Sequence, residues 1–360
     1  MKQISIQTAS KTYPVFIGPG VIEGLSTFIN QAFPTISKLM IITDQTVADL
    51  YLTDIQQVLA DFQTPSCIVP SGEKAKTFEI YYQCLTFALE NKLDRKSLII
   101  AVGGGAVGDL GGFVAATFMR GIPFIQVPTT ILAHDSAVGG KVAINHPSGK
   151  NMIGSFYQPE AVFYDLDFLW SLPLHERRSG FAEVIKHGLI NDSSFYTWLT
   201  EHISSMEKLT VTDLSYMLAR GIEIKNNFVS VDEREAGIRT FLNFGHTLGH
   251  AIEAEAGYGK WTHGEAVVIG MLFALELSRK KVGLSFNHDR FKKWLQQLGY
   301  STDLPKELIH DKLVTRMKQD KKSISEKVNF VLLTEIGNPI SYEISDKELL
   351  HELKIFHKGE

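Results

Sequence analysis

Three histidines lie close together in the sequence and have the right side chains to bind a metal ion. His246 and His250 are four residues apart in "NFGHTLGH", and His263 follows in "WTHGEAV". On a helix, two residues at this spacing lie one turn apart on the same face. Ordinary helices also carry histidine pairs at this spacing, so the spacing alone leaves both interpretations open.

The residues around these histidines predict two helix starts. Thr262 and Glu265 have the T-x-x-E spacing of a capping box, which predicts a helix whose first residue is His263. The positive end of that helix disfavours the imidazolium form of His263, and neutral imidazole is the form that binds a metal. We expect Asn243 to cap the preceding helix and Gly257 to end it.

A carboxylate is the expected third ligand of such a site. Glu183 lies in the otherwise apolar segment "SGFAEVIKHG", where burying an unpaired carboxylate would be costly. Two histidines and one glutamate with an open position form a pattern of catalytic zinc sites. Lys186, one turn away on the same face, offers the alternative of a simple ion pair within the helix. The spacing does not decide between the two.

A glycine-rich turn in residues 97–118 predicts dinucleotide binding. The segment "SLIIAVGGGAVGDLGGFVAATF" combines an apolar strand, a run of glycines and an apolar helical stretch. Gly103, Gly105 and Gly108 match G-x-G-x-x-G in this context, where backbone N–H groups and a helix N-terminus can approach a pyrophosphate. A tight turn without a ligand would show the same glycines.

Polar residues near this turn support the nucleotide interpretation. Asp109 lies just inside the predicted helix, and Thr129 and Thr130 end the next strand. Asp44 ends the strand "MIITD", where it is a candidate for the adenosine ribose. The acid normally found about 20 residues after the glycines is missing from its standard position. We therefore predict a dinucleotide-binding domain that departs from the standard Rossmann fold.

Residues 134–159 are rich in polar residues and glycine, and we predict a long loop between two buried strands. Long ordered loops often carry function, although a solvated surface loop is the alternative. The loop contains Asp135, Lys141, Lys150 and Asn151. Basic residues elsewhere that could act with it are Arg120, Lys225 and Arg239. Together they predict a substrate with more than one anionic group.

Composition excludes several classes of protein. The chain has 360 residues, 44% hydrophobic and 21% charged, with a net charge of −4, so no global basic field points to nucleic acid or to an anionic membrane. Cys67 and Cys84 form no CxxC, which fits a reducing cytoplasm and excludes a thiolate zinc site. We find neither a signal peptide nor an apolar run long enough for a bilayer, and expect a cytoplasmic protein.

The order of segments predicts two domains. Short β-rich runs alternate with helical patterns in the first half, which predicts a parallel sheet covered on both faces. These runs are 38–44, 66–72, 97–102, 122–128 and 161–166, after a strand pair in residues 1–18. One intervening helix has Phe78, Tyr81, Tyr82, Leu85 and Leu89 on one face. We predict a Rossmann-like α/β domain in residues 1–172 and a mainly α-helical domain in residues 173–360.

Seven segments between residues 71 and 267 combine these features. They are "SGEKAK" (71–76), "GGGAVGDLGGF" (103–113), "VPTT" (127–130), "DSAVGGKVAINHPSGKNMIGSFYQP" (135–159), "FAEVIKHG" (181–188), "RTFLNFGHTLGHAIE" (239–253) and "THGEAV" (262–267). In this order they resemble the 3-dehydroquinate synthase family, a member of the sugar phosphate cyclase superfamily. Two departures are visible: Trp170 and Ser171 stand where the family commonly has Lys-Thr, and "AHDSAVGG" replaces a more usual Val-Asp-Ser-Ser.

The resemblance implies an NAD-binding α/β domain joined to an α-helical metal- and substrate-binding domain, usually in a homodimer. It implies Zn²⁺ or Co²⁺ on Glu183, His246 and His263, with His250 facing the substrate. The implied NAD contacts are Asp44, Ser71, Gly72, Glu73, Lys74, Ala75, Lys76, Gly104, Gly105, Ala106, Val107, Gly108, Asp109, Thr129, Thr130, Lys141, Lys150, Phe168, Leu169, Trp170 and Ser171. The implied substrate contacts are Arg120, Asp135, Lys141, Lys150, Asn151, Lys186, Lys225, Arg239, Asn243, His250 and Lys321 or Lys322. The implied catalytic residues are His250, Lys141, Asn243, Glu183 and Lys186.

The family's reaction belongs to the shikimate pathway of aromatic amino acid biosynthesis. It converts 3-deoxy-D-arabino-heptulosonate 7-phosphate to 3-dehydroquinate and phosphate through transient oxidation by NAD, phosphate elimination, re-reduction and an aldol closure. A substrate with a carboxylate and a phosphate would explain a basic cluster on an acidic protein. The alternatives are a sister sugar phosphate cyclase, whose substrate lacks the carboxylate, a metal-dependent polyol dehydrogenase, and a non-enzymatic dinucleotide-binding module.

Overall fold

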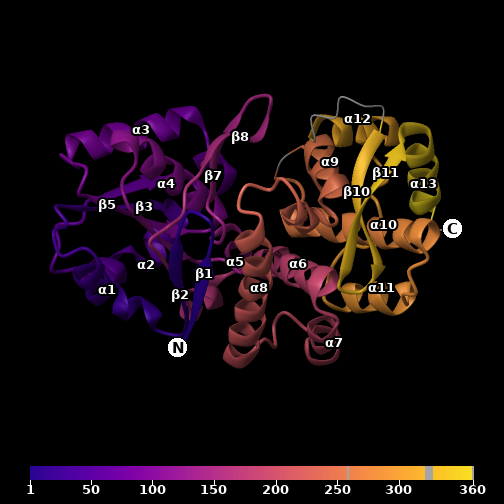
Figure 1. Cartoon of the computed structure of the whole chain (residues 1–360), viewed down its shortest axis with the longest axis horizontal. Coiled ribbons are helices and arrows are strands. Elements are labelled where there is room, and N and C mark those ends of the chain that lie inside the picture. Colours follow the sequence, from indigo (N-terminus) through magenta and orange to yellow (C-terminus); the bar gives the residue numbers. More distant parts are fainter. Residues whose placement is uncertain (258, 321–326, 359–360) are drawn as a thin grey trace. The chain divides into compact units, whose positions relative to one another are not determined.

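The chain folds into two compact units in a computed structural model that describes residues 1–257, 259–320 and 327–358 (Figure 1). Unit 1 consists of Met1–Leu172 and Val211–Arg234. Unit 2 consists of Pro173–Thr210 and Glu235–Glu360. Each unit has its own hydrophobic core.

Unit 1 is built on a seven-stranded sheet with the order β1-β2-β9-β6-β5-β3-β4. Its strands are β1 (Lys2–Gln7), β2 (Thr12–Gly18), β3 (Leu39–Asp44), β4 (Ser66–Val69), β5 (Leu98–Gly103), β6 (Phe124–Pro128) and β9 (Ala161–Asp165). Neighbouring strands run parallel except for β1, which pairs antiparallel with β2. The N-terminal strand pair and the five later strands expected from the sequence all form, so the predicted parallel sheet is confirmed.

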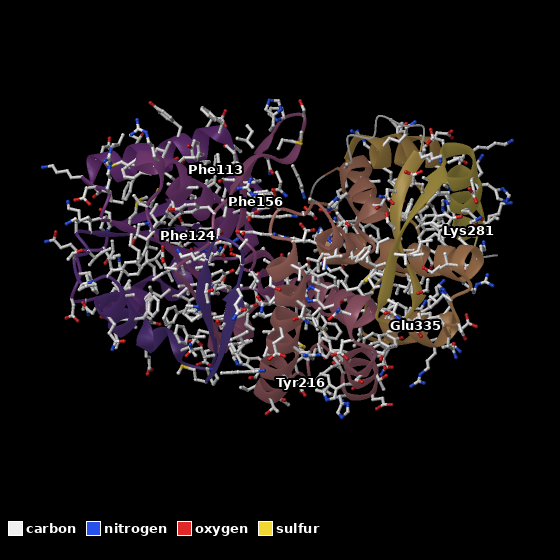
Figure 2. All side chains as sticks on the ribbon, in the orientation of Figure 1. Phe113, Phe124, Phe156, Tyr216, Lys281 and Glu335 are labelled. Carbon is white, nitrogen blue, oxygen red and sulfur yellow. The ribbon has the colours of Figure 1, made fainter. Side chains whose placement is uncertain are left out.

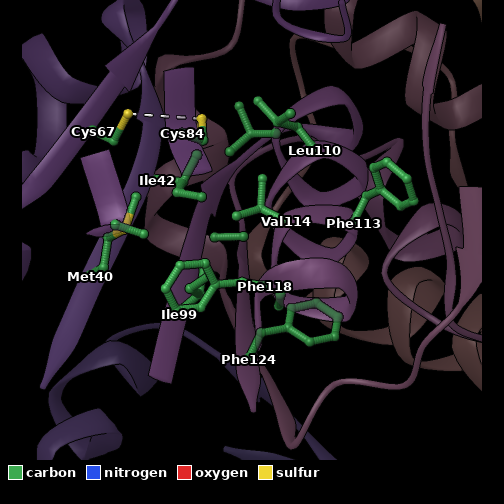
Figure 3. Packing of buried hydrophobic residues seen from close by; sticks show 14 of the residues in the cluster. Met40, Ile42, Cys67, Cys84, Ile99, Leu110, Phe113, Val114, Phe118 and Phe124 are labelled. Atoms are coloured by element: carbon green, nitrogen blue, oxygen red, sulfur yellow. Dashed lines mark hydrogen bonds between the residues drawn. The ribbon is translucent and has the colours of Figure 1, made fainter. Parts of the chain in front are cut away.

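Helices cover both faces of this sheet. They are α1 (Leu25–Ala32), α2 (Gln45–Val58), α3 (Phe78–Glu90), α4 (Gly105–Thr117), α5 (Ala133–Ser136) and α8 (Val211–Val231), with the 3-10 turns η1 (Val21–Gly24), η2 (Gly72–Ala75), η3 (Phe118–Arg120) and η4 (Leu166–Ser171). Met40 and Ile42 of β3 belong to the core beneath α3 and α4, where Leu110 and Val114 lie (Figure 3). Their neighbour Ile41 belongs to the opposite core with α1 and α2. This alternation follows from the two-residue period of a strand.

Helix α3 buries only part of the face that its large apolar residues predict. Phe78, Tyr82 and Leu89 are 58%, 63% and 60% exposed. The fully buried positions are Cys84 and Ala88, which pack against β4 and α4. Tyr81 and Leu85 of the predicted face are partly buried against the same core, whereas Phe78, Tyr82 and Leu89 remain outside.

The predicted long loop in residues 134–159 is largely regular structure, so the loop prediction is wrong. It contains α5 and an antiparallel hairpin of β7 (Lys141–His146) and β8 (Gly149–Phe156). Val142 and Ile144 of β7 point into the core beneath α4, whereas Phe156 at the end of β8 is 42% exposed (Figure 2). The burial of these alternate apolar residues, interspersed among polar ones, holds the hairpin on unit 1.

Unit 2 is mainly helical, as predicted. Its helices are α6 (Leu174–Asn191), α7 (Ser193–His202), α9 (His246–Ala256), α10 (His263–Val282), α11 (His288–Gln297), α12 (His310–Asp320) and α13 (Asp346–Lys358), with the 3-10 turn η5 (Ile238–Asn243). A two-stranded antiparallel sheet of β10 (Lys327–Glu335) and β11 (Asn338–Ser345) was not expected. It completes a core with α9, α10, α12 and α13 that includes Phe273 and Phe330. Within the described ranges, every helix is too short or too polar to cross a bilayer.

Helix α8 belongs to unit 1, although the sequence-based division at residue 172 assigns it to the second domain. It packs against β1, β2, α5 and η4. At its C-terminal end the backbone N–H of Ser10 donates to Glu233, and Gln158 donates to the same carboxylate. The domain boundary was predicted from the point where alternating strands and helices give way to helices alone. That change does not reveal that α8 returns to unit 1, because the sequence of α8 has the same helical pattern as its neighbours in unit 2.

Glycines let helices α9 and α10 touch along their backbones. A Cβ atom on Gly270 would overlap the carbonyl oxygen of Gly245, and one on Gly249 would lie 3.1 Å from Cα of Val267. Contacts this close leave no room for any other side chain at Gly270. The starts of α9 and α10, where His246 and His263 lie, are therefore held at a fixed separation.

We expect Gly270→Ala to lower the free energy of unfolding by about 1–3 kcal/mol, because the added methyl group forces the two helices apart. Gly24→Ala is the control, since a Cβ there would be 3.9 Å from the Phe163 ring, an ordinary contact. Urea-induced unfolding of both variants and the wild type measures the difference. An unchanged transition in Gly270→Ala would mean that the helices are less tightly packed than described.

Candidate active site

Three side chains with metal-binding atoms meet in unit 2. Glu183 comes from α6, and His246 and His263 are the first residues of α9 and α10. One ligand atom from each residue lies within 4.8 Å of the other two. Nε2 of His246 is 3.4 Å from Oε1 of Glu183, and Nε2 of His263 is 3.5 Å from the same oxygen. The structure thus brings the three predicted ligands together.

The remaining ring nitrogens of the two histidines have partners of their own. Nδ1 of His246 is 3.2 Å from the carbonyl oxygen of Phe244, and Nδ1 of His263 is 3.0 Å from Oε2 of Glu253. A metal-binding histidine usually donates its other N–H to a carbonyl or carboxylate in this way. Two imidazole Nε2 atoms and one carboxylate form a donor set that fits a divalent ion such as zinc, with room for a further ligand.

The two carboxylates beside His263 favour a positive charge on its ring. Burial lowers the pKa of His246 to about 3, against the attraction of Glu183, so this ring is neutral. Burial also acts to lower the pKa of His263, but its hydrogen bonds to Glu183 and Glu253 outweigh burial and raise the pKa to about 10. The expectation that the helix end keeps His263 neutral is therefore wrong for the metal-free cluster. A divalent cation bound at Nε2 would balance the negative charge of Glu183 and Glu253, as the second proton of the ring does in its absence.

The ion pair between Lys186 and Glu183 is compatible with metal binding by Glu183. The Lys186 ammonium pairs with Oε2 of Glu183, and both side chains are 1% exposed. The histidine Nε2 atoms face the other oxygen, Oε1. The two alternatives that the sequence left open, an ion pair and a metal ligand, therefore use different oxygens of one carboxylate.

The start of α10 lies directly on α6. The predicted capping box forms, with the Glu265 N–H donating to Thr262 Oγ1 (3.3 Å) and the Thr262 N–H donating to Glu265 Oε2 (3.2 Å). The N–H of Gly264 donates to Oγ of Ser179, and a Cβ on Gly264 would overlap the Ser179 carbonyl oxygen. Because Ser179 is one turn before Glu183, this contact sets the distance from His263 to Glu183.

The start of α9 differs from the prediction. Gly245, with φ +81°, holds the N-cap position that we assigned to Asn243, whereas Gly257 ends the helix as predicted. Asn243 instead ends η5, and its amide donates to Oε1 of Glu235 (3.1 Å). The tight fit of Gly245 against α10 requires a glycine there, a requirement that local capping preferences do not contain.

His250 lies next to the ligand cluster, and Glu253 was missed by the sequence analysis. The His250 ring centre is 5.2 Å from that of His246 and 5.8 Å from that of His263. Glu253 follows His246 by seven residues, so it lies on the same face of α9. An acid at this position in the apolar stretch "HAIEAEA" was the signal that could have identified it.

In unit 1 the glycine-rich turn forms between β5 and α4. A Cβ on Gly105 would lie 2.9 Å from Oγ of Ser136, and one on Gly108 would lie 2.8 Å from Oε1 of Gln126. Thr129 and Thr130 lie beside this turn: the N–H of Thr129 donates to the Gly103 carbonyl (3.0 Å). Helix α4 therefore presents its N-terminal N–H groups at the carboxyl edge of the sheet, the arrangement that binds phosphates in dinucleotide folds. Ala106 and Val107 lie in its first turn.

The other residues implied for NAD lie on turns of unit 1. Asp44 is 6% exposed and caps α2 by accepting from the N–H groups of Thr46 and Val47. Ser71 Oγ donates to the same carboxylate (2.9 Å) and thereby ties the segment 71–76 to the end of β3. Two 3-10 turns carry the rest: η2 holds Gly72, Glu73, Lys74 and Ala75, and η4 holds Phe168, Leu169, Trp170 and Ser171.

A buried lysine connects η2, α4 and the hairpin. Lys76 is 2% exposed, and its ammonium lies 2.6 Å from Oδ2 of Asp109 and also contacts the Asn151 amide oxygen. Burial raises the pKa of Asp109 above its ordinary value, and the Lys76 ammonium opposes that shift. Glu73 accepts from the Asn145 side chain (2.7 Å), which adds a second contact to the hairpin.

The structure distributes the residues implied for the substrate over both units. Unit 1 contains Arg120, Asp135, Lys141, Lys150, Asn151 and Lys225, and unit 2 contains Lys186, Arg239, Asn243 and His250. Lys225 Nζ is 3.0 Å from Oδ2 of Asp135. Arg239 is 1% exposed, whereas Arg120 is exposed and has φ +71°. Lys321 and Lys322 lie outside the described residues.

We expect Lys76→Met to lower the free energy of unfolding by about 1–3 kcal/mol at pH 7, because it leaves the Asp109 carboxylate without its closest cation. The folded-state pKa of Asp109 is already above the unfolded value, so any stability that Asp109 contributes is present at low pH and is lost as pH rises. The variant raises this pKa further. Its deficit should therefore grow between about pH 4 and pH 7.

Chemical unfolding across this pH range measures the effect. Lys74→Met removes an exposed lysine from the same turn and serves as the stability control. A deficit in Lys76→Met that is independent of pH would show that lost packing, and not the Asp109 charge, causes it.

Comparison with known proteins identifies the family. Sequence profiles described as 3-dehydroquinate synthase N-terminal and C-terminal match residues 66–179 and 180–323. A 3-dehydroquinate synthase of Geobacillus thermodenitrificans is 53% identical over 99% of both chains.

Two solved structures share the fold. A 2-deoxy-scyllo-inosose synthase complexed with carbaglucose-6-phosphate, NAD⁺ and Co²⁺ has a TM-score of 0.88 at 26% identity, covering 98% of this chain and 99% of the other. A 2-epi-5-epi-valiolone synthase of Streptomyces hygroscopicus with NAD⁺ and Zn²⁺ bound has a TM-score of 0.85 at 22% identity, covering 100% and 99%. The full-length identity to the first relative, the two matched profiles and the shared two-part fold lead to one conclusion: the chain belongs to the 3-dehydroquinate synthase family.

Proposed function

We propose that the protein converts 3-deoxy-D-arabino-heptulosonate 7-phosphate to 3-dehydroquinate and phosphate, with NAD used and regenerated in each turnover. The observation that carries this proposal is the 53% identity to a 3-dehydroquinate synthase along 99% of both chains. The cluster of Glu183, His246 and His263 and the glycine-rich turn before α4 support it, because they match the two cofactors that this chemistry needs.

Glu183, His246 and His263 would hold the divalent ion, Zn²⁺ or Co²⁺, which would act as a Lewis acid that lowers the pKa of the substrate's C4 and C5 hydroxyls. The turn at Gly104 and Gly105 would hold NAD, whose chemistry would be reversible hydride transfer at C5 of the substrate. The reaction therefore has no net oxidation, and NAD is needed only in catalytic amounts.

Within unit 2, three side chains would bind or move protons around the reacting hydroxyls. His250, beside both ligand histidines, would relay the proton that leaves the hydroxyl. Lys186 neutralises one oxygen of Glu183 and keeps the other directed at the histidines. Asn243, oriented by Glu235, would donate its amide to a substrate oxygen.

The basic residues would hold the two anionic groups of the substrate. Arg239 would bind the carboxylate through two parallel hydrogen bonds, which a guanidinium allows and an ammonium does not. Lys225, fixed by Asp135, and Lys141 would hold the carboxylate and ring hydroxyls. The phosphate would be bound by Arg120, Lys150, Asn151 and either Lys321 or Lys322, and it can itself remove the C6 proton as it leaves. These roles, the homodimer and the cytoplasmic location are our predictions.

We expect purified protein with Zn²⁺ and trace NAD to release phosphate from the heptulosonate phosphate far in excess of the NAD present. Because NADH is reoxidised within each turnover, absorbance at 340 nm should show no lasting rise. A chelator should abolish the release, and added Zn²⁺ or Co²⁺ should restore it. Phosphate release and absorbance followed together make the measurement.

Other outcomes would identify a different reaction. Release from a hexose phosphate but not from the heptulosonate would indicate a sister cyclase, which the 26% identity to 2-deoxy-scyllo-inosose synthase makes the second candidate. The candidate carboxylate-binding residues Lys225, Arg239 and Asn243 favour the heptulosonate. NADH formed in proportion to a simple polyol would indicate a dehydrogenase, and NAD binding without metal or turnover would indicate a non-enzymatic module.

We expect Arg120→Ala to lower kcat/KM for the heptulosonate about 10–100-fold, because a charge-assisted hydrogen bond to phosphate contributes about 1.5–3 kcal/mol. Steady-state phosphate release measures kcat and KM separately. Arg95→Ala, an exposed arginine in the turn before β5, is the matched control and should keep the wild-type values. Full kcat and KM in Arg120→Ala would remove Arg120 from the phosphate site.

A further inference from the structure

Glu253 is a buried acid next to the predicted metal site that has no role in the function proposed above. It is 5% exposed and lies on α9, on the same face as His246 and His250. Its Oε2 is 3.0 Å from Nδ1 of His263. A buried carboxylate is costly unless it is paired or hydrogen-bonded, so its position in the core requires a partner, and the His263 ring provides one.

This contact determines which nitrogen of His263 keeps its proton when a metal ion takes the place of the other proton. A carboxylate accepts hydrogen bonds, so Nδ1 of His263 must donate. Nε2 faces Glu183 Oε1 at 3.5 Å, so a cation that displaces the Nε2 proton leaves a neutral ring with its lone pair at Nε2 and its proton held at Nδ1. The Glu253 contact thus selects the tautomer and the ring orientation that metal binding requires.

The two predicted histidine ligands differ in how they are held. His246 Nδ1 is 3.2 Å from a neutral backbone carbonyl, that of Phe244, whereas His263 Nδ1 faces a carboxylate. A charged acceptor makes an imidazole a stronger electron donor to a metal than a neutral one does. His263 should therefore be the stronger of the two histidine ligands, and its strength should depend on Glu253.

The charges of the cluster agree with this role. Glu183 and Glu253 are both almost fully buried, and Lys186 pairs with Glu183. Two carboxylates and one ammonium leave one negative charge among these three side chains. A divalent cation would turn that excess into a single positive charge, which suits the binding of an anionic substrate, whereas without Glu253 the cluster would carry more positive charge in a buried place.

We propose that Glu253 is a positioning residue that holds His263 in the tautomer and orientation for metal binding and strengthens the bond between His263 and a divalent cation. The inference rests on the metal site of the proposed function. A competing geometry makes Glu253 itself a ligand, since ligand atoms of His250, Glu253 and His263 also lie within 4.8 Å of one another. In this structure, however, Oε2 of Glu253 contacts Nδ1 of His263, whereas Nε2 of His263 faces Glu183.

The test measures Co²⁺ binding to the full chain without substrate, by competition with a chelator and by the visible spectrum of the bound ion. Glu253→Gln keeps the shape and removes the charge, and Glu253→Ala removes the acceptor as well. We expect Glu253→Gln to weaken Co²⁺ binding about 10–100-fold and to shift the Co²⁺ absorption bands. Glu253→Ala should weaken binding at least as much.

Glu255→Gln is the matched control. It removes a glutamate two residues further along α9 whose carboxylate pairs with Lys312 (3.1 Å) and Arg316 (3.5 Å) on α12. We expect its Co²⁺ affinity and spectrum to equal those of the wild type. Thermal unfolding of each metal-free variant shows whether the fold is retained, so that weaker binding is not a consequence of unfolding.

The outcomes separate this inference from the proposed function. Wild-type affinity and spectrum in both Glu253 variants would overturn the positioning role and leave the metal site intact. Complete loss of Co²⁺ binding in both, with the fold retained, would overturn it in favour of Glu253 as a direct ligand. A wild-type protein that binds neither Co²⁺ nor Zn²⁺ would overturn the metal site of the proposed function together with this inference.

Discussion

A carboxylate buried in the middle of a helix is the constraint on which unit 2 depends. Glu183 is 1% exposed, and an isolated charge at such a place would cost several kcal/mol. The Lys186 ammonium pairs with one carboxylate oxygen of Glu183, and the imidazoles of His246 and His263 face the other. Neither histidine lies on the helix of Glu183, so this arrangement exists only while α6, α9 and α10 are packed together.

Backbone contact between helices is what makes that packing possible. Gly245 and Gly270 let α9 and α10 touch, and Gly264 lets the start of α10 rest on Ser179 of α6. Helices separated by ordinary side chains have axes about 8–10 Å apart, and the absent side chains let these three approach more closely. The histidines at the first positions of α9 and α10 therefore converge on one carboxylate oxygen. Glycine lowers the intrinsic stability of a helix, but here these glycines are the positions at which the helices contact one another.

In unit 1, backbone N–H groups and not side chains are the main groups that glycines keep accessible. Helix α4 follows β5 directly, and glycines keep its N-terminal N–H groups accessible beside Thr129 and Thr130. Lys76 is buried against Asp109 and Asn151, so this cation is fixed in place before any ligand arrives. The N-terminal end of α4 provides a local positive potential that does not depend on the net charge of the chain, which is −4.

The sequence by itself determined those features that depend on neighbouring residues. The apolar runs predicted the parallel strands, the glycine spacing predicted the turn before α4, and Thr262 with Glu265 predicted the first residue of α10. The apolar segment around Glu183 suggested it as a third ligand, and the resemblance of seven ordered segments to one family selected His246 and His263 as its partners and placed His250 on the substrate side, which spacing alone left open. Local patterns carry this information because strand period, turn geometry and capping are set within a few residues.

Only the tertiary structure decided features that depend on contacts between distant segments. The buried face of α3 was chosen by close packing against β4 and α4, and Gly245 replaced Asn243 at the start of α9 because α10 lies against it. The β7–β8 hairpin, the β10–β11 sheet and the return of α8 to unit 1 likewise depend on surfaces far away in sequence. Glu253 became meaningful only when the start of α10 placed the His263 ring 3.0 Å from it. These contacts depend on which helices and strands pack against one another. The residue types within a few positions of each site do not determine that packing.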